Sequence, residues 1–435
     1  MQLNRWLLLV FIFCLAVASI LPPLGRSSVA AADDGGQLTV GAIQLVGLVR
    51  TNQEFVLREI GFEAGQRVLQ AEVEAAAQRL RNTNFFVTVE VTPEQGSEGR
   101  TNLRFDFREK WTLTPVLRGG TGGGVDFLVV GLYDLNLLGR GIEAGMQYEQ
   151  YSGAPGVNLW WRQPNFLSPV WKSAIEIQVG KRPVFYLDPG TGQYFTPLAK
   201  AKRLSVTTQR KLRPIDLGLS VEFLERELDS TEFESTVEYE DFKRREEAGI
   251  LARLYLRWNA LNLYDYLWDG HKLEFSAGNL FPRPGSTQSN IQTASLSGTH
   301  FFRFLESHNL GFRFQANWTN GSSLLSLLRL GSLDAVRALD EGERMGRIAW
   351  TVNAEERWVS YVDENLVVQS VVFIDSGNAA KSFAEWPYPT AASAGLGLRI
   401  GIRPIARLRL RADYAHALTG LRKRQGWIVG MQHYF

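Results

Sequence analysis

The sequence predicts a transmembrane antiparallel β-barrel of about 16 strands, preceded by one small α+β domain. Three observations lead to this fold class. From residue 112 onward, apolar and polar residues alternate with a period of two, which places each kind on one side of a sheet. The longest connections between these segments occur at alternate positions along the chain. After the N-terminal apolar run, no stretch approaches the roughly 18 apolar residues that a membrane-spanning helix requires.

Residues 1–32 are predicted to be a cleaved signal peptide. The basic start MQLNR precedes the apolar run WLLLVFIFCLAVASIL, and small residues then supply a cleavage site after Ala32. Cys14, the only cysteine, lies inside the apolar run, and Phe13 before it is too large for a lipoprotein processing site. We therefore expect a mature chain without disulfides or thiol chemistry, exported to a bacterial envelope.

Residues 38–110 predict the small domain, with the element order strand, helix, helix, strand, strand. The first strand is LTVGAIQLVGLV, and the helices are expected over 53–60 and 70–81. The second helix has four apolar residues on one face: Val73, Ala76, Ala77 and Leu80. Residues 85–94 and 101–110 alternate, so they are expected to form a pair of strands.

Residues 111–435 predict the barrel. The approximate centres of its alternating segments are 115, 130, 146, 159, 175, 205, 220, 254, 275, 298, 313, 353, 369, 397, 410 and 431. An even number of strands places both ends of the barrel on one side of the membrane. The longest connections then all lie on the side opposite the small domain, as in outer-membrane barrels; they are 181–199, 227–247, 281–291, 319–346 and 376–391.

A soluble β-sandwich is the alternative to a barrel, because alternation occurs in both. The presumed inward faces carry many charges: Arg253, Arg257, Lys272, Glu274, Arg313, Arg399, Arg407, Arg409 and Arg411. A sandwich core cannot hold these charges unpaired, although its solvent face can. Four residues of the final segment GWIVGMQHYF share one face: Trp427, Val429, Met431 and Phe435. A terminal aromatic on a last strand is similar to the sorting signal of outer-membrane barrels, so the barrel is favoured.

Composition and motifs argue against an enzyme. The formal net charge of +2 does not indicate a nucleic-acid partner. The five histidines lack metal-ligand spacing, and neither a nucleophile elbow nor a paired-carboxylate constellation occurs. The glycine-rich stretch GGTGGG (119–124) lacks the Lys-Ser/Thr of a phosphate-binding loop and is expected to be a turn. We therefore expect no enzymatic activity, no metal and no cofactor.

Three features leave alternatives open. The lumen arginines form either an anion-selective pore or, as we favour, an arginine–carboxylate ladder with Glu222 and Glu274 as partners. The apolar stretch 322–332 either packs as a plug or lies at the membrane interface. The acidic stretch from Leu224 to Glu247 either binds divalent cations that bridge lipid phosphates or, as we favour, is a solvated loop.

Several stretches resemble one family. IQLVGLVRTNQEFVLREIGFEAGQ and LRNTNFFVTVEV are similar to parts of a POTRA domain. GLYDLNLLGRG (131–141) is similar to an Asn-Leu-x-Gly-x-Gly strand, FIDSGNA (373–379) matches a Phe-x-Asp-x-Gly signature, and GLGLRIGI (395–402) is similar to the strand that follows it. Over essentially its whole mature length, the chain resembles the POTRA-plus-barrel superfamily of BamA, TamA and the two-partner secretion translocators, also called the bacterial surface antigen family.

The most specific motif of that family, Val-Arg-Gly-Tyr/Phe, lies in the sixth extracellular loop. The corresponding stretch here is GSLDAVRALDEGE (331–343), in which Val336 and Arg337 are kept. Ala338 and Leu339 replace the glycine and the aromatic residue. The departure at Ala338 falls where a tight backbone approach favours glycine.

The resemblance implies that this loop folds into the barrel lumen as a latch. Arg337 is expected to pair with Asp375 of the Phe-x-Asp-x-Gly signature, which ends at Gly377. A buried guanidinium is costly unless a carboxylate accepts it, and two parallel hydrogen bonds make that pair specific. The alternative is an arginine that only meets water in the outer vestibule.

The resemblance also implies an outer-membrane assembly or translocation factor with its POTRA domain in the periplasm. That domain is expected to capture an unfolded outer-membrane or secreted client, or a periplasmic or inner-membrane partner, by strand addition at an edge among residues 85–110. The barrel is expected to open between its first and last strands and pass the client to or across the bilayer, and Gly426 and Gly430 weaken that last strand. The alternatives are a passive pore or structural barrel, and a component that handles envelope lipids.

Overall fold

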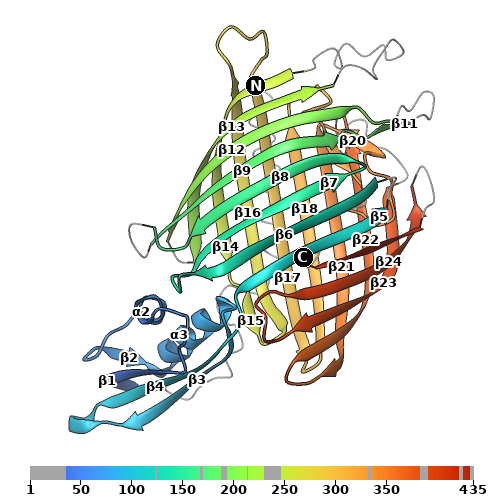
Figure 1. Cartoon of the computed structure of the whole chain (residues 1–435). Coiled ribbons are helices and arrows are strands. Elements are labelled where there is room, and N and C mark those ends of the chain that lie inside the picture. The colour runs from blue at the N-terminus through green and yellow to red at the C-terminus, as the bar shows by residue number, and fades with distance from the viewer. Residues whose placement is uncertain are drawn as a thin grey trace.

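The computed structural model describes residues 36–122, 125–166, 170–187, 194–212, 214–229, 246–331, 335–382, 390–420 and 425–431. The expected signal peptide and Phe435 lie outside these ranges. Figure 1 shows a tall barrel with a small domain at one end. We call the opposite end of the barrel its distal end.

The small domain is a four-stranded sheet with two helices. Its elements are β1 (Gln37–Val46), α2 (Gln53–Ile60), β2 (Arg67–Leu69), α3 (Gln70–Asn82), β3 (Phe86–Gln95), the 3-10 turn η1 (Ser97–Gly99) and β4 (Thr101–Glu109). The sheet order is β2-β1-β4-β3, so β3 and the short β2 are its edges. The predicted order is found, with β2 added; three residues are too few for an alternating pattern to reveal them.

Local sequence explains the two helices. Asn52 begins α2, because its side chain accepts a hydrogen bond of 2.7 Å from the backbone N–H of Glu54. The apolar face predicted for the second helix is the buried face of α3, and it includes Ala76 and Leu80, both at 0% exposure. These side chains belong to one core with Leu103 of β4, so the helices cover one face of the sheet.

Sixteen long strands close the barrel within the described residues. They are β5 (Leu113–Gly122), β6 (Val125–Leu137), β7 (Ile142–Tyr151), β8 (Ala154–Gln163), β9 (Trp171–Pro183), β12 (Leu198–Lys211), β13 (Ile215–Leu228), β14 (Glu246–Asn259), β16 (Leu267–Pro282), β17 (Ile291–Leu305), β18 (His308–Thr319), β21 (Ile348–Val362), β22 (Leu366–Ala380), β23 (Ala391–Ile402), β24 (Arg409–Thr419) and β25 (Gln425–Met431). All neighbours are antiparallel, and β25 pairs with β5. Each predicted centre falls inside one of these strands, so the fold class is confirmed.

Five short strands accompany the long ones. They are β10 (Tyr186–Leu187), β11 (Tyr194–Phe195), β15 (Asn262–Tyr264), β19 (Leu328–Leu330) and β20 (Arg344–Gly346). β15 pairs with the start of β16 next to the small domain, whereas β19 and β20 pair with each other in the long connection between β18 and β21. The connections at the small-domain end are short, such as 306–307 and 363–365, and the long ones lie at the distal end.

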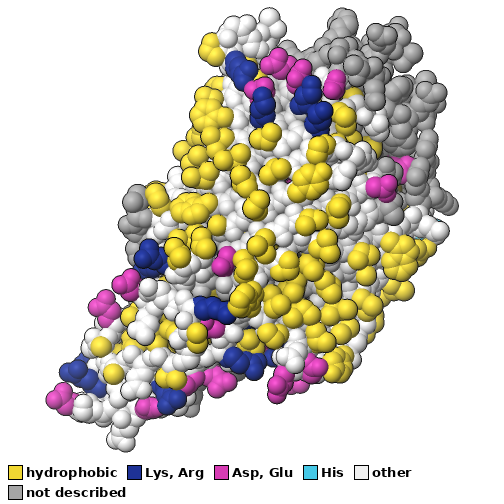
Figure 2. Space-filling view, in the orientation of Figure 1, with side chains coloured by type: hydrophobic (Ala, Val, Ile, Leu, Met, Phe, Trp, Pro, Cys, Tyr) yellow, Lys and Arg dark blue, Asp and Glu magenta, His cyan; other side chains and the backbone are white. Residues whose placement is uncertain are grey.

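The two faces of the barrel wall differ in polarity. Along β14, Leu254 and Leu256 are 59% and 48% exposed on the outer face, while Arg253 and Arg257 form ion pairs on the inner face. Figure 2 shows hydrophobic side chains spread over the outer surface of the barrel. A polar interior behind an apolar exterior suits a barrel in a bilayer and rules out the sandwich alternative. Among the described helices, none is long and apolar enough to cross a membrane.

Candidate functional site

The connection between β18 and β21 folds back into the lumen. Leu324, Leu330, Val336 and Leu339 of this segment are each at most 1% exposed. Leu330, Val336 and Leu339 pack in one apolar cluster that includes Phe373 of the barrel wall. The described part of the stretch 322–332, residues 322–331, therefore packs as a plug, and of the two predicted placements the membrane interface is wrong. We call residues 320–347 the lumen loop.

Arg337 of the lumen loop meets Asp375 of β22. Its Nε and Nη2 atoms lie 2.8 and 2.9 Å from Oδ2 and Oδ1 of that carboxylate, and its backbone N–H donates to Oδ2 at 3.1 Å. Both side chains are fully buried. The fork of the guanidinium thus matches the two carboxylate oxygens, which is the arrangement that offsets the cost of burying both charges.

A wider ion network surrounds this pair. Nη1 of Arg337 also donates to Glu355 at 3.3 Å and to Asp413 at 3.1 Å. Three more wall arginines contact the same two carboxylates: Arg357 and Arg399 with Glu355, and Arg399 and Arg411 with Asp413. Four guanidinium groups therefore share three buried carboxylates, and Glu355 and Asp413 each contact three of these cations. Removing any one of these charged groups therefore leaves buried charge uncompensated on its partners.

The Phe-x-Asp-x-Gly signature supplies three different features to one lumen face. Phe373, Asp375 and Gly377 alternate along β22, so all three face inward. The guanidinium carbon of Arg337 lies 3.2 Å from the centroid of the Phe373 ring, a cation–π contact. A Cβ atom on Gly377 would lie 2.8 Å from the backbone oxygen of Trp350 and 3.1 Å from Leu330 of the lumen loop. The signature thus provides an aromatic face, a carboxylate and space for the loop.

Ala338, which replaces the motif glycine, has a left-handed backbone with φ of 69°. A left-handed backbone costs a residue with a Cβ atom roughly 1–2 kcal/mol, whereas glycine adopts it without this cost. This conformation explains why the motif has glycine at the position of Ala338. Leu339 is fully buried in the apolar cluster of the loop and so fills the place of the aromatic residue.

Replacing Ala338 with glycine is expected to stabilise the protein by about 0.5–1 kcal/mol, because the relief of backbone strain exceeds the entropy that glycine adds to the unfolded chain. The measurement is the urea midpoint at which the heat-modifiable, folded gel band disappears. The matched control is Ala335→Gly, three residues earlier and without a positive φ, for which a small loss is expected. Equal shifts in both variants would show that Ala338 is not strained.

A second clamp holds the lumen loop to another part of the wall. Arg226 of β13 donates to the backbone oxygen of Leu325 at 2.7 Å and forms an ion pair of 2.6 Å with Glu247 of β14. The buried Glu247 carboxylate also accepts a hydrogen bond from the Ser323 hydroxyl. Because β13 and β14 are distant in the barrel order from β22 and β24, the loop spans the lumen and is fixed on both sides.

Other lumen arginines pair with carboxylates across neighbouring strands. Arg253 meets Glu222 at 2.8 Å, and Arg257 meets Glu274 at 2.6 Å. These pairs form the ladder that the sequence favoured, and they use the carboxylates expected. Cross-strand pairs of this kind stiffen the wall and neutralise charge along the pore.

The turn between β6 and β7 docks the small domain onto the barrel. Asn136 donates to the hydroxyl of Thr51 at 3.0 Å and accepts from the backbone N–H of Gly141 at 2.7 Å. The backbone N–H of Asn52 donates to the oxygen of Gly139 at 2.9 Å. A Cβ atom on Gly139 would collide with the backbone oxygen of Arg50. The Asn-Leu-x-Gly-x-Gly stretch therefore makes the joint between the two domains.

A second contact lies across the barrel mouth. Asn82 of α3 accepts from the backbone N–H of Leu263 at 2.9 Å and donates to Asn262 at 3.1 Å. Gln78 of α3 donates to the backbone oxygen of Leu263 at 3.0 Å. Figure 1 shows α3 next to β15 at this end of the barrel. The small domain is thus tied to two separate turns.

Lys110 is a buried titratable group at the joint between the two domains. It is 9% exposed, and its Nζ donates to Asn84 at 2.5 Å. Burial lowers the pKa of Lys110 to about 8; nearby Arg409 and Arg403 add to this effect, and Asp265 opposes it. An unfolded lysine has a pKa near ~10.4, so between about pH 8 and 10 the unfolded chain binds more protons and stability rises with pH.

Raising the pH from 7 to 10 is therefore expected to stabilise the small domain in the full chain by up to about 3 kcal/mol. The gain begins near pH 8, where the folded lysine loses its proton. Pulse proteolysis in denaturant at each pH measures it. In Lys110→Met the rise is expected to vanish, and a rise that persists there would exclude Lys110 as its cause.

The first and last strands of the barrel, β5 and β25, meet at a seam. Within the described residues, β25 and β5 have four register pairs, from Trp427 with Thr121 to Gly430 with Arg118, whereas β12 and β13 have thirteen. Gly119 and Gly120 lie in the seam and offer no side chains to pack. Of the proposed sorting residues, Trp427 and Val429 point outward at 57% and 53% exposure, and Met431 is half-buried.

Sequence patterns alone did not identify two acidic residues of the ion network, Glu355 and Asp413. Arg399 and Arg411 stood out as inward charges, but Glu355 and Asp413 did not, because nothing local marks their partners. The strand register is the information that brings these residues together. In this register Phe373 lies opposite Glu355, and Arg399 lies opposite Arg411. Aligning the predicted strands by their turns would have brought these residues onto one patch of the lumen.

Known proteins match both parts of the chain. Residues 38–110 match the POTRA family, described as surface antigen variable number repeat. The fold is similar to BamA from Haemophilus ducreyi lacking POTRA domains 1–3 (TM-score 0.56, 16% identity, covering 92% of this chain and 85% of that one). It is also similar to CdiB from Acinetobacter baumannii (TM-score 0.56, 14% identity, covering 91% of this chain and 74% of that one). A third similar fold is CdiB from Escherichia coli (TM-score 0.56, 12% identity, covering 94% of this chain and 93% of that one). A search of curated protein sequences returned no match. The predicted POTRA-plus-barrel resemblance is confirmed.

Proposed function

From the POTRA-plus-barrel architecture that this chain shares with BamA and CdiB, we propose that it resides in the bacterial outer membrane with its POTRA domain in the periplasm. There it assembles or translocates client polypeptides. The observation that carries this proposal is the seam, where β25 and β5 share four register pairs in the described residues and glycines replace packed side chains. A seam of this kind separates at lower cost than the other strand pairs.

The lumen loop favours this function over a passive pore. The loop is clamped through Arg337 on one wall and Arg226 on the other, so it occupies the path that a solute would take. Client strands are instead proposed to pair with the free edges that appear when the seam opens. Folding of the client supplies the free energy.

Client or partner capture is proposed at β3, the longer edge of the POTRA sheet. Two features restrict this edge. Pro93 has no N–H to donate, and Arg81 Nη2 already donates to the backbone oxygen of Val89 at 2.9 Å. An added strand is therefore proposed to use the backbone around Val91, between those two positions.

Depletion of the protein, followed by proteomics of the outer membrane, tests the proposed function. Loss of several barrel proteins supports assembly, and loss of one secreted protein supports dedicated secretion. An unchanged outer membrane would refute both. In that case a large conductance in planar bilayers that survives deletion of 38–110 would favour the passive pore, and a tethering partner recovered through the POTRA domain would favour lipid handling.

A further inference from the structure

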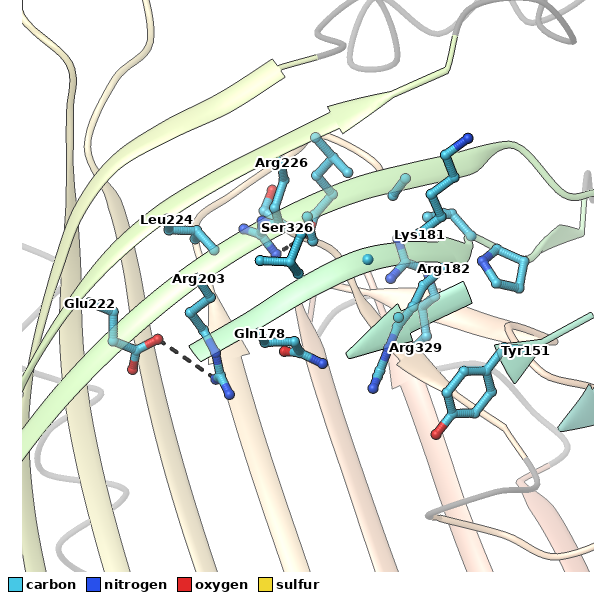
Figure 3. Close-up of a pocket in the computed structure, with 18 of the residues that line it drawn as sticks. Tyr151, Gln178, Lys181, Arg182, Arg203, Glu222, Leu224, Arg226, Ser326 and Arg329 are labelled. Atoms are coloured by element: carbon cyan, nitrogen blue, oxygen red, sulfur yellow. Dashed lines mark hydrogen bonds and ion pairs between the residues drawn. The ribbon is translucent and has the colours of Figure 1, made fainter. Parts of the chain in front are cut away.

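A cavity of about 530 Å³ lies in the distal half of the lumen, between the lumen loop and the wall formed by β7–β9, β12–β14 and β16–β18. Its lining includes five arginines, Arg182, Arg203, Arg226, Arg253 and Arg329, and three carboxylates, Glu149, Glu222 and Glu341. Figure 3 shows Arg203 beside Gln178 and Arg226 beside Ser326, while Lys181 extends away from them. The cavity is therefore rich in guanidinium groups, which lie among apolar lining residues such as Leu224 and Leu251.

Three of these arginines have a donor without an acceptor. The Nε–H groups of Arg203, Arg226 and Arg329 are buried and have no hydrogen-bond partner among the described residues. Buried donors are nearly always satisfied, because an unmet one costs roughly 1–3 kcal/mol. Three unmet donors around one cavity indicate a ligand with several acceptor atoms.

Arg329 adds a charge that no carboxylate contacts directly within the described ranges, and Glu341 and Glu247 act on it only at longer range. Arg203 pairs with Glu176 at 2.5 Å and Arg226 with Glu247 at 2.6 Å, but Arg329 forms no ion pair within the described ranges. Its guanidinium donates to the backbone oxygen of Leu324 instead. A cation in such a site is stabilised by an anion, and guanidinium forks match the oxygens of phosphate closely.

We propose that this cavity binds a phosphate group, which joins Arg203 and Arg226 of the wall to Arg329 of the lumen loop. The phosphate is either the free ion or a group carried by an outer-leaflet lipid, and both present the same oxygens. Because the ligand contacts wall and loop together, it stabilises the loop in the lumen and keeps the barrel closed. This site is independent of the proposed assembly function.

Purified full-length protein in neutral detergent tests the site. Sodium phosphate and sodium chloride are compared at equal ionic strength and pH, and the temperature at which the folded gel band disappears is recorded. Phosphate is expected to raise this temperature in a saturable manner, whereas chloride is not. Equal effects of the two salts would reflect screening only and would exclude the free ion as the ligand.

Two variants locate the effect. Arg329→Gln is expected to weaken phosphate binding by about tenfold or more, since it removes charge-assisted hydrogen bonds. Without phosphate it is expected to be at least as stable as the parent, because an unpaired buried charge is lost. Arg283→Gln is the matched control, because Arg283 is exposed and does not line the cavity, and this variant should bind phosphate like the parent. Unchanged phosphate binding in Arg329→Gln would overturn the site.

A lipid arm separates the two sources of phosphate. Lipopolysaccharide with its phosphates and the same lipid after enzymatic dephosphorylation are added to the detergent micelles. Stabilisation by inorganic phosphate alone assigns the free ion, and stabilisation only by the phosphorylated lipid assigns its headgroup; both support the site. No stabilisation by either source would overturn it.

Discussion

Arg337→Glu is expected to destabilise the barrel by about 3–5 kcal/mol and to release the lumen loop. The new carboxylate would face Asp375, Glu355 and Asp413 in a fully buried site, so like charges would repel each other where Arg337 joins them in the parent. Denaturation in urea, followed by gel migration of the folded form, measures the stability. Single-channel conductance reports whether the lumen loop occupies the lumen, and it is expected to rise when the loop is released.

A charge swap distinguishes the latch from a general loss of structure. Arg337→Glu combined with Asp375→Arg restores opposite charges and is expected to recover part of the stability and lower the conductance again. Arg283→Glu serves as the control, because that exposed arginine should change stability by less than about 1 kcal/mol. A double variant no better than the worse single one would refute the latch.

Closing the seam with a disulfide is expected to abolish function in a reversible manner. Gly119 and Val429 lie directly opposite each other on β5 and β25, so cysteines there are within bonding reach. The single native cysteine, Cys14, lies in the expected signal peptide, which leaves no competing thiol in the mature chain. If strands separate during each cycle, the oxidised protein should lose at least about tenfold in activity, and a reductant should restore it.

The measurement is complementation of a depletion strain, with client abundance in the outer membrane as readout and a gel to verify the cross-link. The matched control is a cysteine pair at Ala277 and Ala294, directly opposite on β16 and β17 and far from the seam. This pair should cross-link without loss of function. Full complementation by the completely oxidised seam variant would show that the seam need not open.

The barrel was predictable because its determinants are local. Alternation marks each strand, as in β18, where Phe312 and Phe314 follow the same two-residue period as their neighbours. The helices α2 and α3 were also predicted, and the apolar face around Ala76 is the face that α3 buries. The short strand β2 was not, because its pairing depends on a partner distant in sequence.

The candidate site was only partly visible in the sequence. Arg337 and Asp375 were paired through a motif, and the structure places them 2.8 Å apart. Glu355 and Asp413 could not be assigned, since their contact with Arg337 depends on the register of four strands. The strain at Ala338 was also hidden, because the sequence marks the departure from glycine but not the sign of φ.

The two ties of the POTRA domain couple its docking to the shape of the barrel wall. One tie is at Asn136, next to the seam, and the other is at Leu263, half a barrel away. If the seam opens as proposed, we expect the wall that carries the first tie to move relative to the wall that carries the second. We then expect at least one tie to lengthen beyond hydrogen-bonding distance, so docking of the domain would oppose opening of the barrel. A client that displaces the domain from either turn thereby lowers the work of opening the wall.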